Sequence, residues 1–199
     1  MKNIVKFLED SEYENKTELC SIMNECGSDK GNGHHNYTTL YDFLWGDIKS
    51  KIKNVFEVGV GTTTPGFTHG MGPDGTVGAS LYGWEKYFPN ANIYSCDIDK
   101  DCLFQTDRIK TYYCDQRKSG NVQNIFNEIG CDDFDIIIVI YFMVLIFFIN
   151  FFNLLPVRYL YVVCINPFFP FNECCVFQSN FRITIFIHIG LRIIVNKYT

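Results

Sequence analysis

The sequence predicts a parallel α/β sheet whose strands alternate with helices. Two observations support this fold class most directly. An apolar run over residues 55–60 leads into two glycines one residue apart, Gly59 and Gly61, and a second run over residues 91–96 ends at Asp97. Segments with helical spacing of apolar residues separate these runs, and this alternation is typical of a parallel sheet covered by helices.

The first part of the chain is expected to be helical. Thr17 can cap a helix over residues 18–25 by accepting a backbone hydrogen bond through its side chain. A polar, glycine-rich loop follows at residues 27–33. A second helix is expected to begin at residue 38 or 39 and to lead into the first strand.

The run over residues 55–60 has the composition of a buried strand, and Glu57 is its only charge. Gly59 and Gly61 can take positive φ, and without a Cβ they let a flat ligand lie against the backbone. Residues 62–77 are rich in glycine, proline and threonine, so we expect an irregular surface loop beside the glycine turn.

The remaining segments continue the alternation of helices and strands. Residues 78–88 form the expected crossover helix, and residues 109–114 form a third strand. Ser119 is expected to cap a helix that ends at Ile129, and a fourth strand begins at Phe134.

A glycine turn after one strand and a carboxylate at the tip of the next favour a nucleoside-type ligand. The turn clears room for the ligand, and the acid accepts hydrogen bonds from ribose hydroxyls. Asp97 is preferred over Asp99 because it directly ends the apolar strand. A dinucleotide site is less favoured, because Thr64 stands where that fingerprint requires glycine or alanine.

The overall composition excludes several classes of function. The 199 residues suffice for one domain with a core, and a net charge of −5 without a Lys/Arg run argues against a nucleic-acid partner. Nine cysteines without a C-x-x-C pair, and the lack of a signal-peptide pattern, predict reduced thiols and a cytoplasmic location. Cys96 and Cys114 are expected to be small buried hydrophobes. His34, His35 and His69 lie in polar loops without a carboxylate cluster, so no metal site is predicted.

The composition changes abruptly at Asp135. The residues up to this point carry a net charge of −8, whereas those beyond it carry +3 and include eleven of the 19 phenylalanines. Residues 136–155 contain no charged side chain and are long enough to span a bilayer. One alternative for this protein is therefore attachment to a membrane through this stretch.

Taken together, the motifs of residues 15–138 resemble those of the class I S-adenosylmethionine-dependent methyltransferases. The closest resemblance is to the O-methyltransferase branch that includes the mycinamicin and demethylmacrocin macrolide-sugar enzymes. The resemblance rests on these segments: residues 27–31 with 35–41, residues 56–61, residues 78–81 with Trp84 and 87–91, residues 93–99, residues 108–110, and Asp115 with Gln116.

The resemblance implies a Rossmann-like parallel sheet, S-adenosylmethionine as cofactor, and O-methylation of a small molecule or a sugar hydroxyl. It also implies roles for individual residues: Glu57, Gly59 and Gly61 beside the methionine part of the cofactor, Asp97 at the ribose, Asp115 and Gln116 at the adenine, and Ser28, Lys30 and Tyr37 in a lid over the cofactor. From its loop context alone, Lys30 would be a solvated surface lysine.

The catalytic half of that family is not recognisable here. In the family, the fourth strand ends in an acidic pair followed by histidine, which serve as metal ligands and base, whereas residues 136–144 contain neither. The magnesium ligand motif implied by the resemblance is therefore absent, and the catalytic residues are unknown. The residue pattern of 154–165 is similar to that of the family's later turn and strand, although Val157 and Arg158 stand where glycines would be.

These observations divide the chain into a helical N-terminal lid (1–53), a cofactor-binding core (54–138) and an apolar, atypical tail (139–199). Our hypothesis for the tail is a frameshifted or decayed C-terminus, so that the regular sheet ends after the fourth strand. The favoured function is an S-adenosylmethionine-dependent methyltransferase whose activity has been reduced or lost. The alternatives are a non-catalytic cofactor-binding protein and the membrane-attached protein.

Overall fold

The computed structural model describes two parts of the chain to different depth. Side chains and backbone are described over most of residues 17–139, with gaps at 32–37, 68–70, 72–73, 116–117, 119 and 132. Within residues 162–196 it describes the backbone of four short strands. Tyr37, Gln116, Ser119 and the three loop histidines lie outside the described residues.

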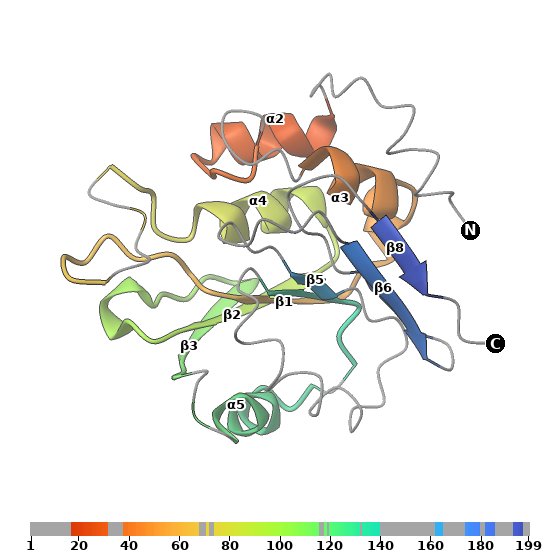
Figure 1. Ribbon diagram of the computed structural model, residues 1–199. Coiled ribbons are helices and arrows are strands. Elements are labelled where there is room, and N and C mark those ends of the chain that lie inside the picture. The colour runs from red at the N-terminus through yellow and green to blue at the C-terminus, as the bar shows by residue number, and fades with distance from the viewer. Residues whose placement is uncertain are drawn as a thin grey trace.

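Five parallel strands form the central sheet and confirm the predicted fold class (Figure 1). The strands are β1 (Asn54–Val58), β2 (Asn92–Asp97), β3 (Ile109–Tyr113), β4 (Ile136–Val139) and β5 (Val162–Cys164). Their order is β3-β2-β1-β4-β5, so the direction of strand addition reverses between β1 and β4. In open α/β sheets, ligands bind outside the carboxyl ends of the strands at such a reversal.

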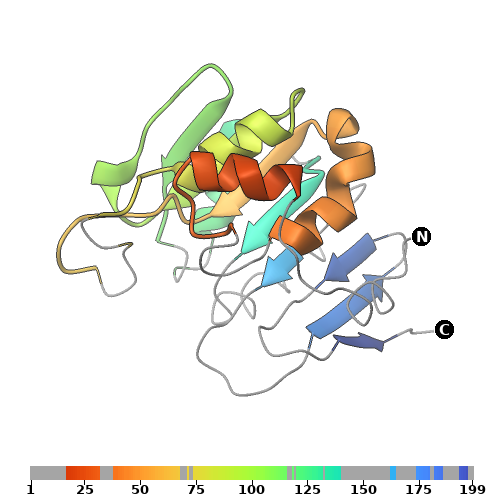
Figure 2. The same ribbon diagram turned by 90° about the horizontal axis from the view of Figure 1, so that it is seen from above.

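Helices cover both faces of the sheet, so the fold has three layers. Helix α4 (Ala79–Tyr87) lies on one face, beneath α2 (Glu18–Glu25) and α3 (Thr38–Trp45), and α5 (Asn121–Ile129) lies on the opposite face (Figures 1 and 2). Among the described residues, the 3-10 turn η1 (Gly46–Lys51) lies between α3 and β1, and the 3-10 turn η2 (Lys100–Cys102) lies between β2 and β3.

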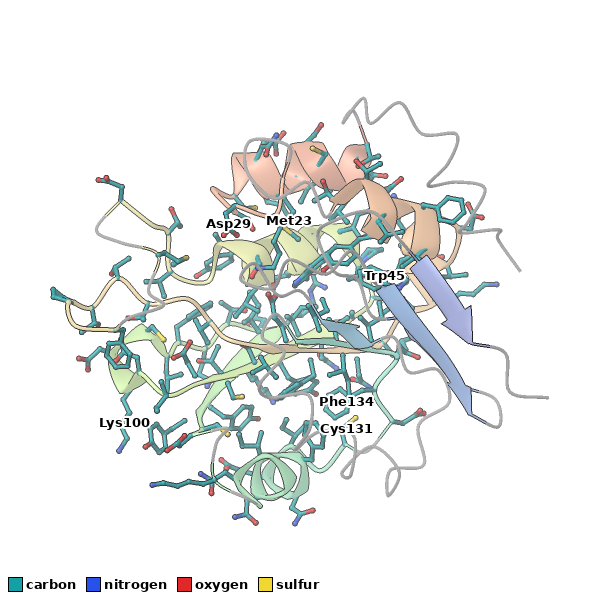
Figure 3. The ribbon with its side chains drawn as sticks, in the orientation of Figure 1. Met23, Asp29, Trp45, Lys100, Cys131 and Phe134 are labelled. Atoms are coloured by element: carbon teal, nitrogen blue, oxygen red, sulfur yellow. The ribbon has the colours of Figure 1, made fainter. Side chains whose placement is uncertain are left out.

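The core is built from aromatic side chains on both sides of β1, because successive residues of a strand face opposite sides of the sheet. Toward α4, a buried cluster joins Tyr41, Trp45, Trp84 and Phe88. Toward α5, the rings of Phe56, Phe126 and Phe134 pack against one another (Figure 3, Phe134). Glu57 follows Phe56 and therefore faces the α4 layer.

The helix boundaries follow from local chemistry, with one correction. Thr17 accepts a hydrogen bond from the Cys20 backbone N–H at 3.1 Å, and α2 begins at the next residue, as predicted. The second helix begins at Thr38, one of the two expected positions. The prediction of Ser119 as the cap of α5 is wrong: Gly120 occupies the N-cap position with φ +85°, a conformation that glycine adopts without steric cost.

The strands after Val139 extend the fold beyond what the sequence predicted. β5 pairs in parallel with β4. It lies within residues 154–165, whose pattern is similar to that of a later strand in the family. A separate three-stranded sheet follows, formed by β6 (Cys174–Ser179), β7 (Arg182–Ile185) and β8 (Ile193–Asn196) in the order β7-β6-β8. The regular sheet therefore does not end at the fourth strand.

The proposed bilayer-spanning stretch begins inside the sheet. Ile136–Val139 is strand β4 and pairs with β1, and residues 140–155 lie outside the described part of the chain. Among the helices that the structure does describe, none combines the length and the apolar character needed to cross a membrane.

Two buried serines on the α4 side of the sheet allow us to compare the loss of a hydrogen-bonded hydroxyl with the loss of one that has no partner among the described residues. Ser80 donates to a Glu57 carboxylate oxygen at 3.0 Å, whereas the Ser95 hydroxyl has no partner among the described residues. Ser80→Ala should lower the free energy of unfolding by about 1.5–3 kcal/mol, since hydrogen bonds to charged groups contribute that much. Ser95→Ala should leave it unchanged or raise it. Urea unfolding of both variants tests this, and an equal loss in both would contradict it.

Candidate functional site

The glycine turn after β1 lies at the carboxyl edge of the sheet. Gly59 and Gly61 have φ of +99° and +91°, which side-chain-bearing residues rarely adopt. The Gly59 N–H donates to the Cys96 carbonyl of β2 at 2.9 Å. Among the described residues, a Cβ added at Gly59 would meet nothing within 4 Å, whereas one at Gly61 would lie 2.7 Å from Met71. The turn is therefore open in front of Gly59 and closed in front of Gly61.

Asp97 holds this turn in place from the end of β2. One carboxylate oxygen, Oδ2, accepts hydrogen bonds from the Val60 and Gly61 backbone N–H groups at 2.9 and 3.3 Å. The other, Oδ1, accepts from the Asp99 N–H at 2.9 Å. A carboxylate can accept about four hydrogen bonds, so this half-buried side chain retains acceptor capacity for a ligand hydroxyl.

Asp99 has a different task, because its carboxylate faces the loop that follows the glycine turn. Its Oδ2 accepts a hydrogen bond from the Thr62 hydroxyl, and its Oδ1 accepts one from the Asp101 N–H at 3.0 Å. The Thr62 hydroxyl also accepts from the Thr64 N–H at 3.0 Å. Asp99 therefore fixes the start of the 62–77 loop, and Asp97 is the carboxylate at the turn.

The hydrogen bonds to Asp99 predict a pH dependence of stability. The Thr62 hydroxyl, then Thr64 and the Asp101 N–H, hold the pKa of Asp99 below its ordinary value of 3.8. As the pH falls, the unfolded chain binds a proton at Asp99 before the folded chain does. The stabilisation that ionised Asp99 gives the fold is therefore fully present above the ordinary pKa of aspartate and is lost as the pH falls below it. Thermal unfolding from pH 5 to 3 should show a smaller loss of stability for Thr62→Val than for the wild type. Parallel curves for the two proteins would contradict this.

Glu57 is the most completely buried charge of the site. Its Oε2 accepts hydrogen bonds from the Ser80 hydroxyl at 3.0 Å and from the Trp84 indole Nε1–H at 2.6 Å, both from α4. Its Oε1 lies 3.0 Å from the Lys30 ammonium, and the two side chains are 0% and 8% exposed. The expectation of a solvated Lys30 is therefore wrong. A buried carboxylate is costly without a cationic partner, and Lys30 supplies one.

The loop that carries Lys30 is joined both to α2 and to the edge of the site. The Ser28 N–H donates to the Met23 carbonyl at 2.9 Å, and the Ser28 hydroxyl accepts from the Lys30 N–H at 3.3 Å. A Cβ at Gly27 would lie 3.0 Å from the Thr76 hydroxyl, so the loop packs against the 62–77 segment. Figure 3 shows Met23 and Asp29 above α4, and Glu57 faces this side of the sheet through its hydrogen bonds with Ser80 and Trp84 of α4.

Asp115 follows β3 and is buried. Its backbone carbonyl accepts hydrogen bonds from the Lys118 N–H at 3.0 Å and from the Asn121 side chain at 3.1 Å, which leads the chain into α5. Its carboxylate lies 3.8 Å from the Lys118 ammonium. The Cys114 N–H donates to the Asp97 carbonyl at 2.8 Å, so the ends of β2 and β3 lie side by side.

Cys96 and Cys114 are buried, as predicted. A hydrogen bond between the two thiols, together with burial, raises the pKa of Cys96, and the same hydrogen bond lowers the pKa of Cys114. Within the described residues, no three histidine, cysteine or carboxylate side chains are grouped so that they could hold a metal ion. The side chains that sequence reasoning missed are Thr62, Met71, Ser80 and Trp84.

No protein-family model matches the chain. Among characterised proteins, it is similar to two Streptomyces olivaceus enzymes, the 8-demethyl-8-alpha-L-rhamnosyl tetracenomycin-C 2'-O-methyltransferase, 30% identical over 112 residues, and the corresponding 3'-O-methyltransferase, 32% identical over 111 residues. Each match covers 56% of this chain and 26–27% of the relative. The mycinamicin VI 2''-O-methyltransferase of Micromonospora griseorubida is 30% identical over 123 residues, which are 62% of this chain and 28% of that enzyme.

Among solved structures, the MycE methyltransferase of the mycinamycin biosynthetic pathway, in complex with Mg, S-adenosylhomocysteine (SAH) and mycinamycin VI, matches with a TM-score of 0.49 at 30% identity. The match covers 62% of this chain and 31% of that one. The resemblance to the macrolide-sugar O-methyltransferases is confirmed, at modest identity over about 60% of the chain. The chain spans about a quarter of the length of the curated relatives that it matches.

Proposed function

We propose that this chain binds S-adenosylmethionine at the carboxyl edge of β1, β2 and β3, as the cofactor-binding part of a methyltransferase that acts on a small molecule or a sugar hydroxyl. The observation that carries the proposal is the glycine turn, which is open in front of Gly59 and held by Asp97. The similar proteins are O-methyltransferases named for rhamnosyl and macrolide substrates.

In this proposal each candidate site residue has a defined role. The methionine part of the cofactor lies over Gly59 beside Glu57 and Gly61, and the free acceptor capacity of Asp97 binds a ribose hydroxyl. Asp115 lies at the end of the neighbouring strand and is assigned to the adenine, with Gln116 following it. Ser28 and Lys30 belong to the N-terminal lid over the cofactor, together with Tyr37. The division into lid (1–53), core (54–138) and tail (139–199) is part of the same proposal.

S-Adenosylmethionine is an activated methyl donor, and a protein that transfers its methyl group has to position the acceptor hydroxyl and supply a base. The residues described above position the cofactor. The sequence from Ile136 to Tyr161 contains no aspartate, glutamate or histidine that could act as the base or hold a magnesium ion. This observation favours a second candidate function, a non-catalytic protein that binds the cofactor. The proposed location is cytoplasmic.

Titration calorimetry with SAH tests the binding site. The wild type should bind, and Asp97→Ala should weaken binding through loss of ribose hydrogen bonds worth about 1.5–3 kcal/mol. Asp101→Ala, at an exposed carboxylate a few residues further on, is the control and should leave the affinity unchanged. Lack of binding by the wild type, or equal affinity in all three proteins, would contradict the proposed site.

Incubation of the same wild-type sample with S-adenosylmethionine and a rhamnosylated or macrolide acceptor distinguishes the two candidate functions. The loss of general-base help lowers the rate by roughly 10²–10⁴-fold, so we expect binding with little or no turnover. Robust metal-dependent methylation would assign catalytic groups to parts of the chain outside the described residues.

A further inference from the structure

The second glycine of the turn, Gly61, is in contact with a side chain from the loop that follows it. A Cβ built on Gly61 would lie 2.7 Å from Met71 Cε, 2.8 Å from its Sδ and 3.5 Å from its Cγ. The first two distances are too short for a carbon atom, so a side chain at position 61 would displace Met71. Glycine at this position therefore leaves room for Met71, in addition to allowing a φ of +91°.

The backbone of Met71 is joined to the residue that follows this glycine. The Met71 N–H donates to the Thr62 carbonyl at 2.8 Å. Thr62 is in turn fixed by its hydroxyl, which donates to Asp99. Met71 is therefore held against the turn by its backbone at Thr62 and by its side chain at Gly61, although it is 38% exposed.

Gly61 is the residue of the turn that most needs such a contact. Its N–H donates to Asp97 Oδ2 at 3.3 Å, whereas the Val60 N–H donates to the same oxygen at 2.9 Å. Glycine loses more conformational freedom on folding than any other residue, so a long hydrogen bond alone holds it weakly. An unbranched, adaptable side chain that packs on its Cα restricts this freedom. The packing of Met71 therefore supports the hydrogen bond between Gly61 and Asp97.

We propose that Met71 is a positioning residue of the cofactor site, which holds Gly61, and through it the Asp97 carboxylate, in the arrangement that binds the ribose. This inference rests on the proposed function and refines it. It assigns the space in front of Gly61 to a side chain of the protein and the space in front of Gly59 to the ligand. Met71 acts through Gly61 and is assigned no contact with the cofactor.

Titration calorimetry with SAH on two variants of Met71 tests this role. Met71→Ala removes the packing on Gly61 and should weaken SAH binding roughly 3- to 10-fold, the effect of loosening one hydrogen bond. Leucine has a volume similar to that of methionine, so Met71→Leu should retain the wild-type affinity. Because Met71 is a half-exposed loop residue, both variants should fold, which thermal unfolding verifies.

Phe67 provides the matched control, since it lies on the same loop and is 39% exposed. Among the described residues, the three atoms nearest to a Cβ at Gly61 all belong to Met71, so Phe67→Ala should leave the affinity unchanged. Amide hydrogen exchange measured by NMR without ligand is an independent readout. The Gly61 N–H should exchange roughly 3- to 10-fold faster in Met71→Ala and at the wild-type rate in Met71→Leu and Phe67→Ala.

An unchanged affinity in Met71→Ala would overturn the role of Met71 while leaving the proposed function intact. So would an equal loss of affinity in Phe67→Ala, or a loss in Met71→Ala without faster exchange at Gly61, because the effect would then not pass through the glycine. Failure of the wild type to bind SAH would overturn the proposed function and, with it, the role of Met71 at a cofactor site.

Discussion

Gly59→Val is expected to abolish most of the cofactor affinity without unfolding the protein. In the part of the chain that the structure describes, the space in front of Gly59 is open, so the branched side chain would meet no atom of these residues and would occupy the volume assigned to the ligand. Overpacking of this kind costs roughly 1–3 kcal/mol, and we therefore expect the affinity for SAH to fall by about 10- to 100-fold. Titration calorimetry measures this loss directly.

The control has to separate loss of space from backbone strain, because Gly59 has a positive φ. Gly120 also has a positive φ, +85°, and it precedes α5 on the opposite face of the sheet. No atom of the described residues lies within 4 Å of a Cβ added there. Gly120→Val should lower stability by a similar amount and leave the affinity unchanged. If both variants bind as weakly as each other, strain rather than occupied space explains the effect, and the assignment of the site is wrong.

Many helices, strands and turns in the first 139 residues could be predicted because interactions between neighbouring residues determine them. A capping threonine at Thr17, alternation of apolar runs with helical segments, and a glycine turn at Gly59 all act over a few neighbouring residues. One contact that fixes the sheet, by contrast, joins distant segments: the Asp135 carboxylate accepts hydrogen bonds from the Lys53 and Asn54 N–H groups at 2.6 and 3.1 Å. The last charge before the apolar tail thus joins the start of β4 to that of β1.

The features that could not be predicted depend on contacts between distant segments. A single glutamate inside a buried strand requires a partner, and the sequence shows that requirement at Glu57 but not that Lys30, 27 residues earlier, meets it. The same limit applies to Ser80 and Trp84, which look like ordinary positions of a crossover helix. Asp97 was found by its place at the strand end, but its hydrogen bonds to the glycine turn follow only from the fold.

The buried ion pair should also make the largest contribution of any single contact described here to stability. Lys30→Met alone leaves the Glu57 carboxylate with two neutral donors and no counter-charge inside the core. Removal of one partner of a buried pair typically costs about 3–5 kcal/mol, whereas replacement of both partners is often close to neutral. We therefore expect a severe loss of stability in Lys30→Met and substantial recovery in Lys30→Met/Glu57→Gln.

Urea unfolding followed by tryptophan fluorescence is a suitable measurement, since both tryptophans, Trp45 and Trp84, lie in the core and Trp84 donates to Glu57. Lys49→Met, at the surface pair with Glu18, should cost no more than about 1 kcal/mol because solvent screens exposed charges. If Lys30→Met were as mild as Lys49→Met, the ammonium would have to be solvated in the folded protein. In that case the Lys30–Glu57 ion pair would not contribute measurably to the stability of the fold.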